Sequence, residues 1–251
     1  MHSNWIIRSK PNPQARLRLF CFPYAGGSAS IFRSWSDQLP QNIEVCAVEL
    51  PGRGTLMRLA PYTQLKPLVE AIAQSLLPNL NQPFALFGHS MGALISFELA
   101  RFLRQAYGLT PRHLFVSGRA APYIPDRDPP IYTLPDAAFI QELRRLNGTP
   151  EAVLQNQELM QLLTPILRAD FAAIDTYRYQ PEPALGCPIT ALGGLQDLEV
   201  SRDDLEAWQT QTIAPFQIQL FLGNHFFLHS AQSLLLKAIA QQLQAVEPAI
   251  G

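Results

Sequence analysis

Residues 83–103 read PFALFGHSMGALISFELARFL, and this stretch decides the fold. A short apolar run, 84–87, leads into a turn with Ser90 at its apex, and a long apolar segment follows. Gly88 and Gly92 flank the serine two residues away on each side, which matches the strand–turn–helix pattern G-x-S-x-G of a nucleophile elbow. We expect a side chain at either glycine to collide with the neighbouring strand or helix. Backbone N–H groups at the start of the helix can then stabilise an oxyanion.

The bulk composition fits one large α/β domain. The chain has 251 residues, of which 47% are hydrophobic and 16% charged, so it can bury a sizeable core. Its formal net charge of −1 argues against a nucleic-acid-binding protein. The N-terminal residues lack the apolar core of a signal peptide, and no apolar run approaches 18 residues. We therefore expect a cytoplasmic protein that does not contact a membrane.

The three cysteines point to the same compartment. Cys21 and Cys46 lie in expected strands, and Cys187 precedes the proline that opens another strand. Their odd number and the absence of C-x-x-C spacing favour buried free thiols in a reducing compartment over a metal or redox site.

Apolar runs and helical periodicities alternate along the chain. Strands are expected at residues 16–23, 43–48, 84–87, 112–117, 188–192 and 216–222, with a possible edge strand at 5–8. Helices are expected at 30–39, 64–77, 91–103 and 230–246. This alternation, with short links, predicts a mainly parallel sheet with helices on both faces.

One interval interrupts the alternation. About 70 residues between Ser117 and Pro188 contain helical patterns at 135–146, 149–155 and 158–179 but no strand. We interpret them as a helical lid insertion, approximately residues 123–185, within a single domain spanning 1–251. The alternative is an extra pair of helices that cover the sheet.

A serine nucleophile needs a general base, which is usually histidine. Of the five histidines, His225 lies in the loop after the last expected strand, from where it can reach across the sheet edge to Ser90. His229 is one helical turn later, so it should face elsewhere, and His89 should point away from the reacting hydroxyl. The H-x-x-x-H spacing could ligate a metal only with a third ligand, and none is evident. We therefore predict His225 as the base and no metal site.

The base needs a carboxylate that orients its ring. Asp197 follows the strand at 188–192 and lies in the turn after it. Its rivals are Glu199, Asp203 and Asp204, of which the last two suit the first turn of a helix that starts near Ser201. The predicted order Ser90, Asp197, His225 is that of the α/β-hydrolase fold.

The oxyanion donors should be backbone N–H groups. Met91, directly after the nucleophile, supplies one. The second should come from the glycine-rich loop after the first long strand, where Ala25 is predicted and Tyr24 remains open as an alternative.

Four sequence blocks together resemble the type II thioesterases, the stand-alone editing enzymes of non-ribosomal peptide and polyketide synthesis. They are FPYAGGSA at 22–29, LPGRG at 50–54, FGHSMGA at 87–93 and GNHFFL at 223–228. The resemblance covers almost the whole chain and carries over the triad assignment. Asn224 departs from the pattern, because the family commonly has a second glycine before the histidine. Asparagine tolerates a left-handed backbone, so the loop should survive.

The resemblance implies hydrolysis of acyl groups from the phosphopantetheine arm of acyl or peptidyl carrier proteins. We expect the enzyme itself to be a monomer without a cofactor. It also implies a mobile lid over the acyl chamber. Alternatives are hydrolysis of acyl-CoA or small esters on the same scaffold and, in another class, a non-catalytic carrier-binding module. Because carrier proteins are acidic, a basic patch is expected near the entrance. Its candidates are Arg53, Arg58, Arg119, Arg127, Arg144 and Arg145.

Overall fold

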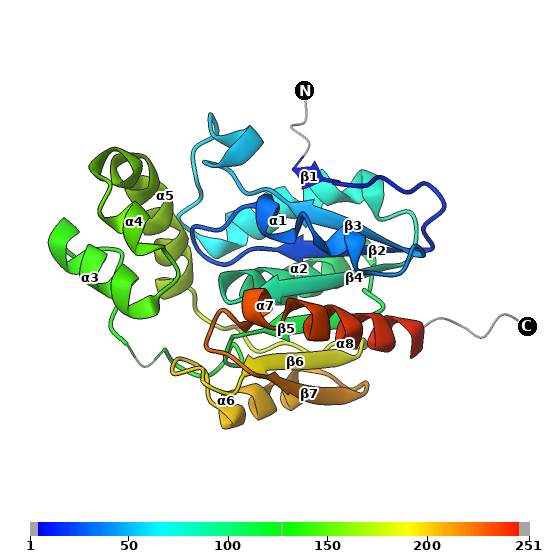
Figure 1. Cartoon of the computed structure of the whole chain (residues 1–251). Helices are drawn as coiled ribbons and strands as arrows, with labels where there is room; N and C mark the ends of the chain where they lie inside the picture. Colours follow the sequence, from blue (N-terminus) through cyan, green and yellow to red (C-terminus); the bar gives the residue numbers. More distant parts are fainter. Residues whose placement is uncertain (1–4, 127, 246–251) are drawn as a thin grey trace, which may run out of the picture.

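The computed structural model describes residues 5–126 and 128–245. Its centre is a seven-stranded sheet in the order β1-β3-β2-β4-β5-β6-β7, in which only β1 runs antiparallel to its neighbour (Figure 1). The strands are β1 (Ile6–Ile7), β2 (Leu17–Phe22), β3 (Ile43–Val48), β4 (Phe84–His89), β5 (Leu114–Ser117), β6 (Ile189–Gly194) and β7 (Phe216–Phe221). The mainly parallel sheet predicted from the sequence is confirmed.

Both faces of the sheet are covered, because successive residues of a strand point to opposite faces. Phe20 and Phe22 of β2 join a core with helices α1 (Leu65–Leu76) and α2 (Met91–Tyr107). Leu19 and Cys21 join a second core with helix α8 (Gln232–Ala245). The remaining short elements are α6 (Arg202–Glu206), α7 (Phe227–Ser230), η3 (Gly54–Leu56), η4 (Leu77–Asn79) and η5 (Ala207–Gln211). All three cysteines are free and buried, as predicted.

The predicted helix at 30–39 is wrong. The segment forms two short 3-10 turns, η1 (Ala29–Phe32) and η2 (Trp35–Asp37). Phe32 and Trp35, three residues apart, pack on one another with ring centroids 4.9 Å apart and on Phe87 of the sheet. Serines at four positions of 28–36 favour turns over a regular helix, because their hydroxyls compete for backbone hydrogen bonds.

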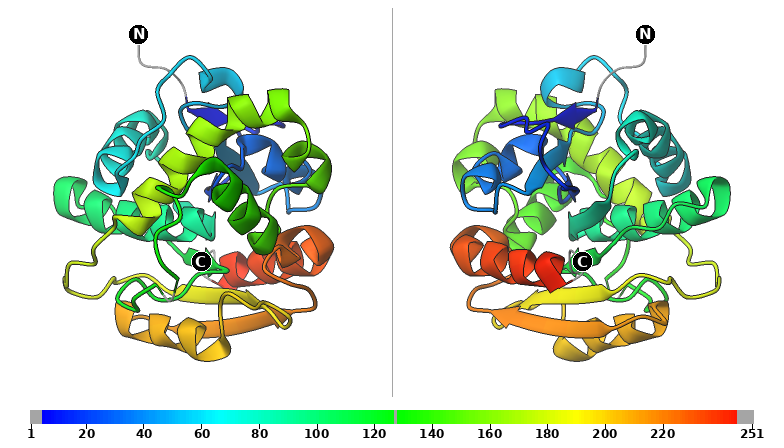
Figure 2. Two further views of the ribbon diagram at one scale, coloured as in Figure 1. Left: turned by 90° about the vertical axis from the view of Figure 1, so that its left-hand side faces the viewer. Right: turned by 90° about the vertical axis from the view of Figure 1, so that its right-hand side faces the viewer.

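The long interval between β5 and β6 is helical, as expected. It forms α3 (Asp136–Leu146), α4 (Glu151–Leu154) and α5 (Gln157–Asp175), which have a small core of their own around Phe139 and Met160. The three helices lie beyond the carboxyl ends of the parallel strands, and in the left view of Figure 2 they stand in front of the sheet. We call residues 118–188 the helical insertion.

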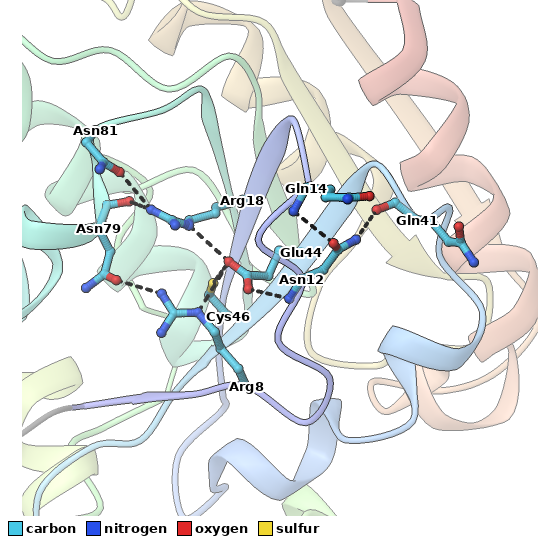
Figure 3. Close-up of polar contacts among 9 residues, drawn as sticks. All are labelled: Arg8, Asn12, Gln14, Arg18, Gln41, Glu44, Cys46, Asn79 and Asn81. Atoms are coloured by element: carbon cyan, nitrogen blue, oxygen red, sulfur yellow. Dashed lines mark hydrogen bonds and ion pairs between the residues drawn. The ribbon is translucent and has the colours of Figure 1, made fainter.

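The amino end of the sheet carries a buried polar network (Figure 3). Glu44 of β3 accepts hydrogen bonds from the Asn12 backbone N–H at 2.9 Å and from Arg18 Nε at 3.0 Å, and Arg8 Nε lies 3.3 Å away. Burial raises the pKa of the Glu44 carboxyl, but these hydrogen bonds and the two guanidinium charges outweigh it and hold the pKa below its usual value. This Glu44 network ties the N-terminal segment to the sheet.

No helix in the described part of the chain combines the length and the apolar character needed to cross a lipid bilayer.

Candidate active site

The elbow around Ser90 is strained as a nucleophile elbow requires. Ser90 has φ 53° and ψ −112°, a region that residues with a side chain rarely occupy. Its N–H donates to the Ser117 carbonyl at 2.7 Å, which anchors the turn to β5. A Cβ at Gly88 would overlap the Gly92 carbonyl, and one at Gly92 would overlap the backbone of Phe22. Both glycines are therefore required, as the sequence predicted.

His225 and Asp197 meet at the carboxyl edge of the sheet. His225 Nδ1 lies 2.9 Å from Asp197 Oδ2, and the Asp197 side chain is fully buried. Asp197 Oδ1 accepts from the backbone N–H groups of Glu199 at 2.9 Å and Val200 at 3.3 Å. The backbone thus fixes one oxygen of this carboxylate, and the other oxygen is aimed at the imidazole of His225.

The turn after β6 and the turn after β7 lie in close backbone contact, which brings Asp197 and His225 together. Gly194, at the end of β6, approaches the carbonyl oxygens of Gly223 and Asn224 so closely that a Cβ would overlap them. Asn224 does not adopt the left-handed backbone considered for it. Its side chain instead accepts from the Phe226 N–H at 2.9 Å, so the asparagine orders the loop through a hydrogen bond.

Two of the rival carboxylates and the rival histidine have other partners, and the third carboxylate, Asp203, lies in the first turn of α6 as expected. Glu199 pairs with Arg145 at 3.0 Å. Asp204 forms a capping box with Ser201 at the start of α6, where the sequence placed it. His229 Nε2 lies 3.2 Å from the Tyr24 hydroxyl.

His89 lies beneath the site. Its Nδ1 is 2.9 Å from Ser117 Oγ, and its ring centroid is 5.1 Å from that of His225. Burial, with smaller contributions from the nearby His225 and His229, holds the pKa of His89 well below its usual value. The ring is therefore neutral and adds no charge beside His225.

The loop after β2 forms a tight turn beside the serine. Gly27 N–H donates to the Tyr24 carbonyl at 2.9 Å, and Gly26 has φ 76°, a conformation that favours glycine. Ala25, inside this turn, faces the same cavity as Ser90. Met91 is the first residue of α2, so its N–H has no partner within the helix.

Ser90 and His225 line one cavity of about 680 Å³ between the sheet edge and the helical insertion. Three apolar side chains of the helical insertion, Leu143, Leu146 and Phe171, line this cavity. Leu163 and Ile166 line a neighbouring pocket of about 250 Å³, which Tyr24 and Ala25 also border. Two further apolar residues of the insertion line neither pocket: Phe139 packs inside the insertion, and Leu162 is 65% exposed.

The expected basic patch is mostly neutralised. Arg144 pairs with Glu151 at 2.8 Å, and Arg145 pairs with acidic side chains on three sides. The prediction that Arg53 contributes to a surface patch is wrong. Arg53 is buried, and two of its nitrogens donate to the Asp170 carboxylate of α5. Arg127 lies outside the described residues.

Within residues 5–126 and 128–245, no group of three or more His, Cys, Asp or Glu side chains is arranged to hold a metal ion.

Comparison with known proteins identifies the family of this chain. The model of the thioesterase domain family matches residues 17–245. The chain belongs to this family. It is therefore a thioesterase, and the resemblance to type II thioesterases drawn from the four sequence blocks is confirmed.

Relatives are similar over nearly the whole chain. The protein named linear gramicidin dehydrogenase LgrE, of Brevibacillus parabrevis, is 50% identical over 97% of this chain and 94% of its own. Thioesterase PikA5 of Streptomyces venezuelae is 40% identical over 90% of this chain and 80% of its own. The solved structure of the type II thioesterase BorB from the borrelidin biosynthetic cluster superposes with a TM-score of 0.87 and 38% identity, covering 96% of this chain and 98% of BorB. The α/β-hydrolase fold is thus confirmed as well.

Proposed function

We propose that Ser90 is the nucleophile of a thioester hydrolase, with His225 as its base and Asp197 as the group that orients the base. The observation that carries this proposal is the 2.9 Å contact between His225 Nδ1 and the buried Asp197 carboxylate, together with the cavity that both His225 and Ser90 line. A carboxylate on Nδ1 leaves Nε2 as the atom that accepts a proton.

The reaction then has two halves. Ser90 Oγ attacks the thioester carbonyl carbon while its proton moves to His225 Nε2, and the oxyanion is held by the N–H groups of Ala25 and Met91. The C–S bond breaks, the sulfur leaves with the proton, and the acyl group remains on Ser90. Water, deprotonated by His225, attacks this ester, and the Ser90 oxygen recovers the proton as the acid leaves.

We infer that the substrate is an acyl or peptidyl group on the phosphopantetheine arm of a carrier protein, so the enzyme itself needs no cofactor. The names of two relatives support this inference, because LgrE is named for linear gramicidin and BorB comes from the borrelidin biosynthetic cluster. The cavity supports it too, since its walls include apolar side chains of the helical insertion. The insertion would act as the lid, in a cytoplasmic monomer.

The test is a comparison of kcat/KM for one acyl group carried by a carrier protein, by CoA and by a simple oxygen ester. We expect the carrier-bound thioester to be hydrolysed fastest. Preference for the ester would reject the thioester proposal, and equal rates with CoA and carrier would favour the acyl-CoA alternative. Varying the acyl length on the carrier would then measure the depth of the cavity.

A non-catalytic carrier-binding module is the alternative from another class. A fluorophosphonate probe separates the two, because it labels only a serine activated by its base. We expect the label on Ser90 and its loss in Asp197→Asn. Absence of label from wild-type protein would favour the binding module.

A further inference from the structure

The block LPGRG at 50–54 contains an arginine that the triad does not use. The Arg53 side chain is 7% exposed and the Asp170 side chain 4%. Arg53 Nη1 and Nη2 each lie 2.7 Å from one oxygen of the Asp170 carboxylate, which is a two-bond, fork-to-fork pair. The pair joins the loop after β3 to the middle of helix α5 in the helical insertion.

The same two side chains also hold the turn that carries Ala25. Asp170 Oδ2 accepts from the Gly26 N–H at 2.7 Å, and Arg53 Nη1 donates to the Gly27 carbonyl at 3.1 Å. One turn earlier on α5, Leu167 packs on Gly26 so closely that a Cβ there would lie 2.5 Å from its Cδ2 atom. Helix α5 therefore contacts this turn through both a charged and an apolar side chain.

A donor N–H stabilises an oxyanion only if it is already aimed at the position of the developing charge. The Ala25 N–H belongs to the peptide directly before the one that Asp170 fixes. We propose that the Arg53–Asp170 pair is a positioning pair, which holds the Ala25 N–H in place and makes helix α5 part of the oxyanion machinery. This inference rests on the proposed role of Ala25.

Two observations favour positioning over simple stabilisation. A buried ion pair contributes little net stability compared with apolar side chains of the same size, because both charges lose their hydration. In addition, Phe171 and Ile174 follow Asp170 on α5 and line the cavity that holds Ser90. The helix that contacts an acyl chain is thus the helix that fixes the donor loop, so substrate packing and oxyanion geometry share one rigid element.

The test uses the full-length chain with three changes: Asp170→Asn, Arg53→Lys, and the apolar double variant Arg53→Met with Asp170→Leu. The double variant removes both charges together, which keeps the fold, whereas each single change leaves one partner. Glu44→Gln is the matched control, because its carboxylate is equally buried and paired with arginine but lies at the opposite end of the sheet. The substrate is a short acyl-pantetheine thioester.

We expect kcat of the folded double variant and of Asp170→Asn to fall by about tenfold or more with KM within about threefold, as for loss of alignment of one oxyanion donor. The kcat of Arg53→Lys should lie between the kcat of these variants and that of the wild type. Amide hydrogen exchange of a peptide covering residues 24–28 should accelerate in the same variants and stay unchanged in Glu44→Gln.

A folded double variant with wild-type kcat and wild-type exchange in residues 24–28 would overturn the proposal. Failure of the proposed function looks different: Ser90→Ala would then hydrolyse the thioester at the wild-type rate. The exchange measurement does not depend on catalysis, so it tests the anchoring of the turn in either case.

Discussion

Two buried carboxylates stand at opposite ends of the same sheet. Asp197 follows β6 at the carboxyl end and has a fully buried side chain, while Glu44 lies near the start of β3 and is 4% exposed. Asp197 accepts hydrogen bonds from two backbone N–H groups and Glu44 from one, and each also bonds a nitrogen-bearing side chain. In local bonding the two groups are closely similar.

The difference lies in the partner. Glu44 faces Arg8 and Arg18, and a guanidinium group does not exchange its proton in catalysis. The network can therefore hold segments of the chain together but cannot transfer a proton. Asp197 faces a histidine, which can take up and release a proton, and this histidine borders a cavity with Ser90. A buried carboxylate therefore becomes part of a reaction site through the chemistry of its partner and the space beside that partner.

The largest expected effect comes from removing the charge at the carboxyl end. Asp197→Asn should lower kcat by about 10³–10⁴-fold, because an amide no longer selects the tautomer of His225 that leaves Nε2 free. Steady-state kinetics and a thermal melt measure this. Glu199→Gln, two residues away, is the control and should keep kcat. A similar loss in both variants would mean that the loop, and not the Asp197 charge, matters.

A second variant tests the close contact between Gly92 of the elbow and the backbone of Phe22. Gly92→Ala should cost more than about 3 kcal/mol of unfolding free energy, since the new methyl group would overlap the backbone of Phe22. Gly186→Ala is the control, because nothing lies within 4 Å of its Cβ position. Denaturant unfolding of both variants checks the prediction, and equal midpoints would contradict it.

Removing the charge at the amino end should have the opposite profile. Glu44→Gln should lower the unfolding free energy by about 1–3 kcal/mol, because it weakens hydrogen bonds to two arginines, and should leave kcat unchanged. A drop in kcat as large as that of Asp197→Asn would remove the distinction between the two ends.

The smallest expected effect is the pH dependence of the unfolding free energy that Glu44→Gln loses. The folded pKa of Glu44 is below its usual value, so its contribution is complete above the unfolded pKa of about 4.3 and disappears as the pH falls through the folded value. The stability difference between wild type and Glu44→Gln should therefore shrink on acidification below about pH 4. If this stability difference stayed constant on acidification, Glu44 would not take up a proton in that range, and the prediction would be wrong.

Local patterns in the sequence predicted the strands and the elbow well. Residues 43–48 form a strand with the predicted bounds. The run is apolar except for Glu44 and is buried on both faces, as is usual for a strand inside a parallel sheet. The elbow could be predicted because each glycine is fixed by a backbone contact. The segment 30–39 could not, because its apolar spacing fits a helix while its serines favour turns.

The Arg53–Asp170 pair was missed for a different reason. Its members are 117 residues apart, and no local pattern links them. The available signal was Asp170 itself, an acidic residue on the face of α5 that also buries Ile166 and Ala173. A charge on the apolar face of a helix requires a buried partner, and the arginine of LPGRG is that partner.

The most direct test of the account is hydrolysis of an acyl-pantetheine thioester by Ser90→Ala. Ser96→Ala is the control, since Ser96 is a buried serine on the same helix whose hydroxyl bonds only the Ala93 carbonyl among the described contacts. We expect Ser90→Ala to lose at least about 10⁴-fold in kcat and Ser96→Ala to keep most of its kcat. Wild-type turnover by Ser90→Ala would contradict the assignment of Ser90 as the nucleophile.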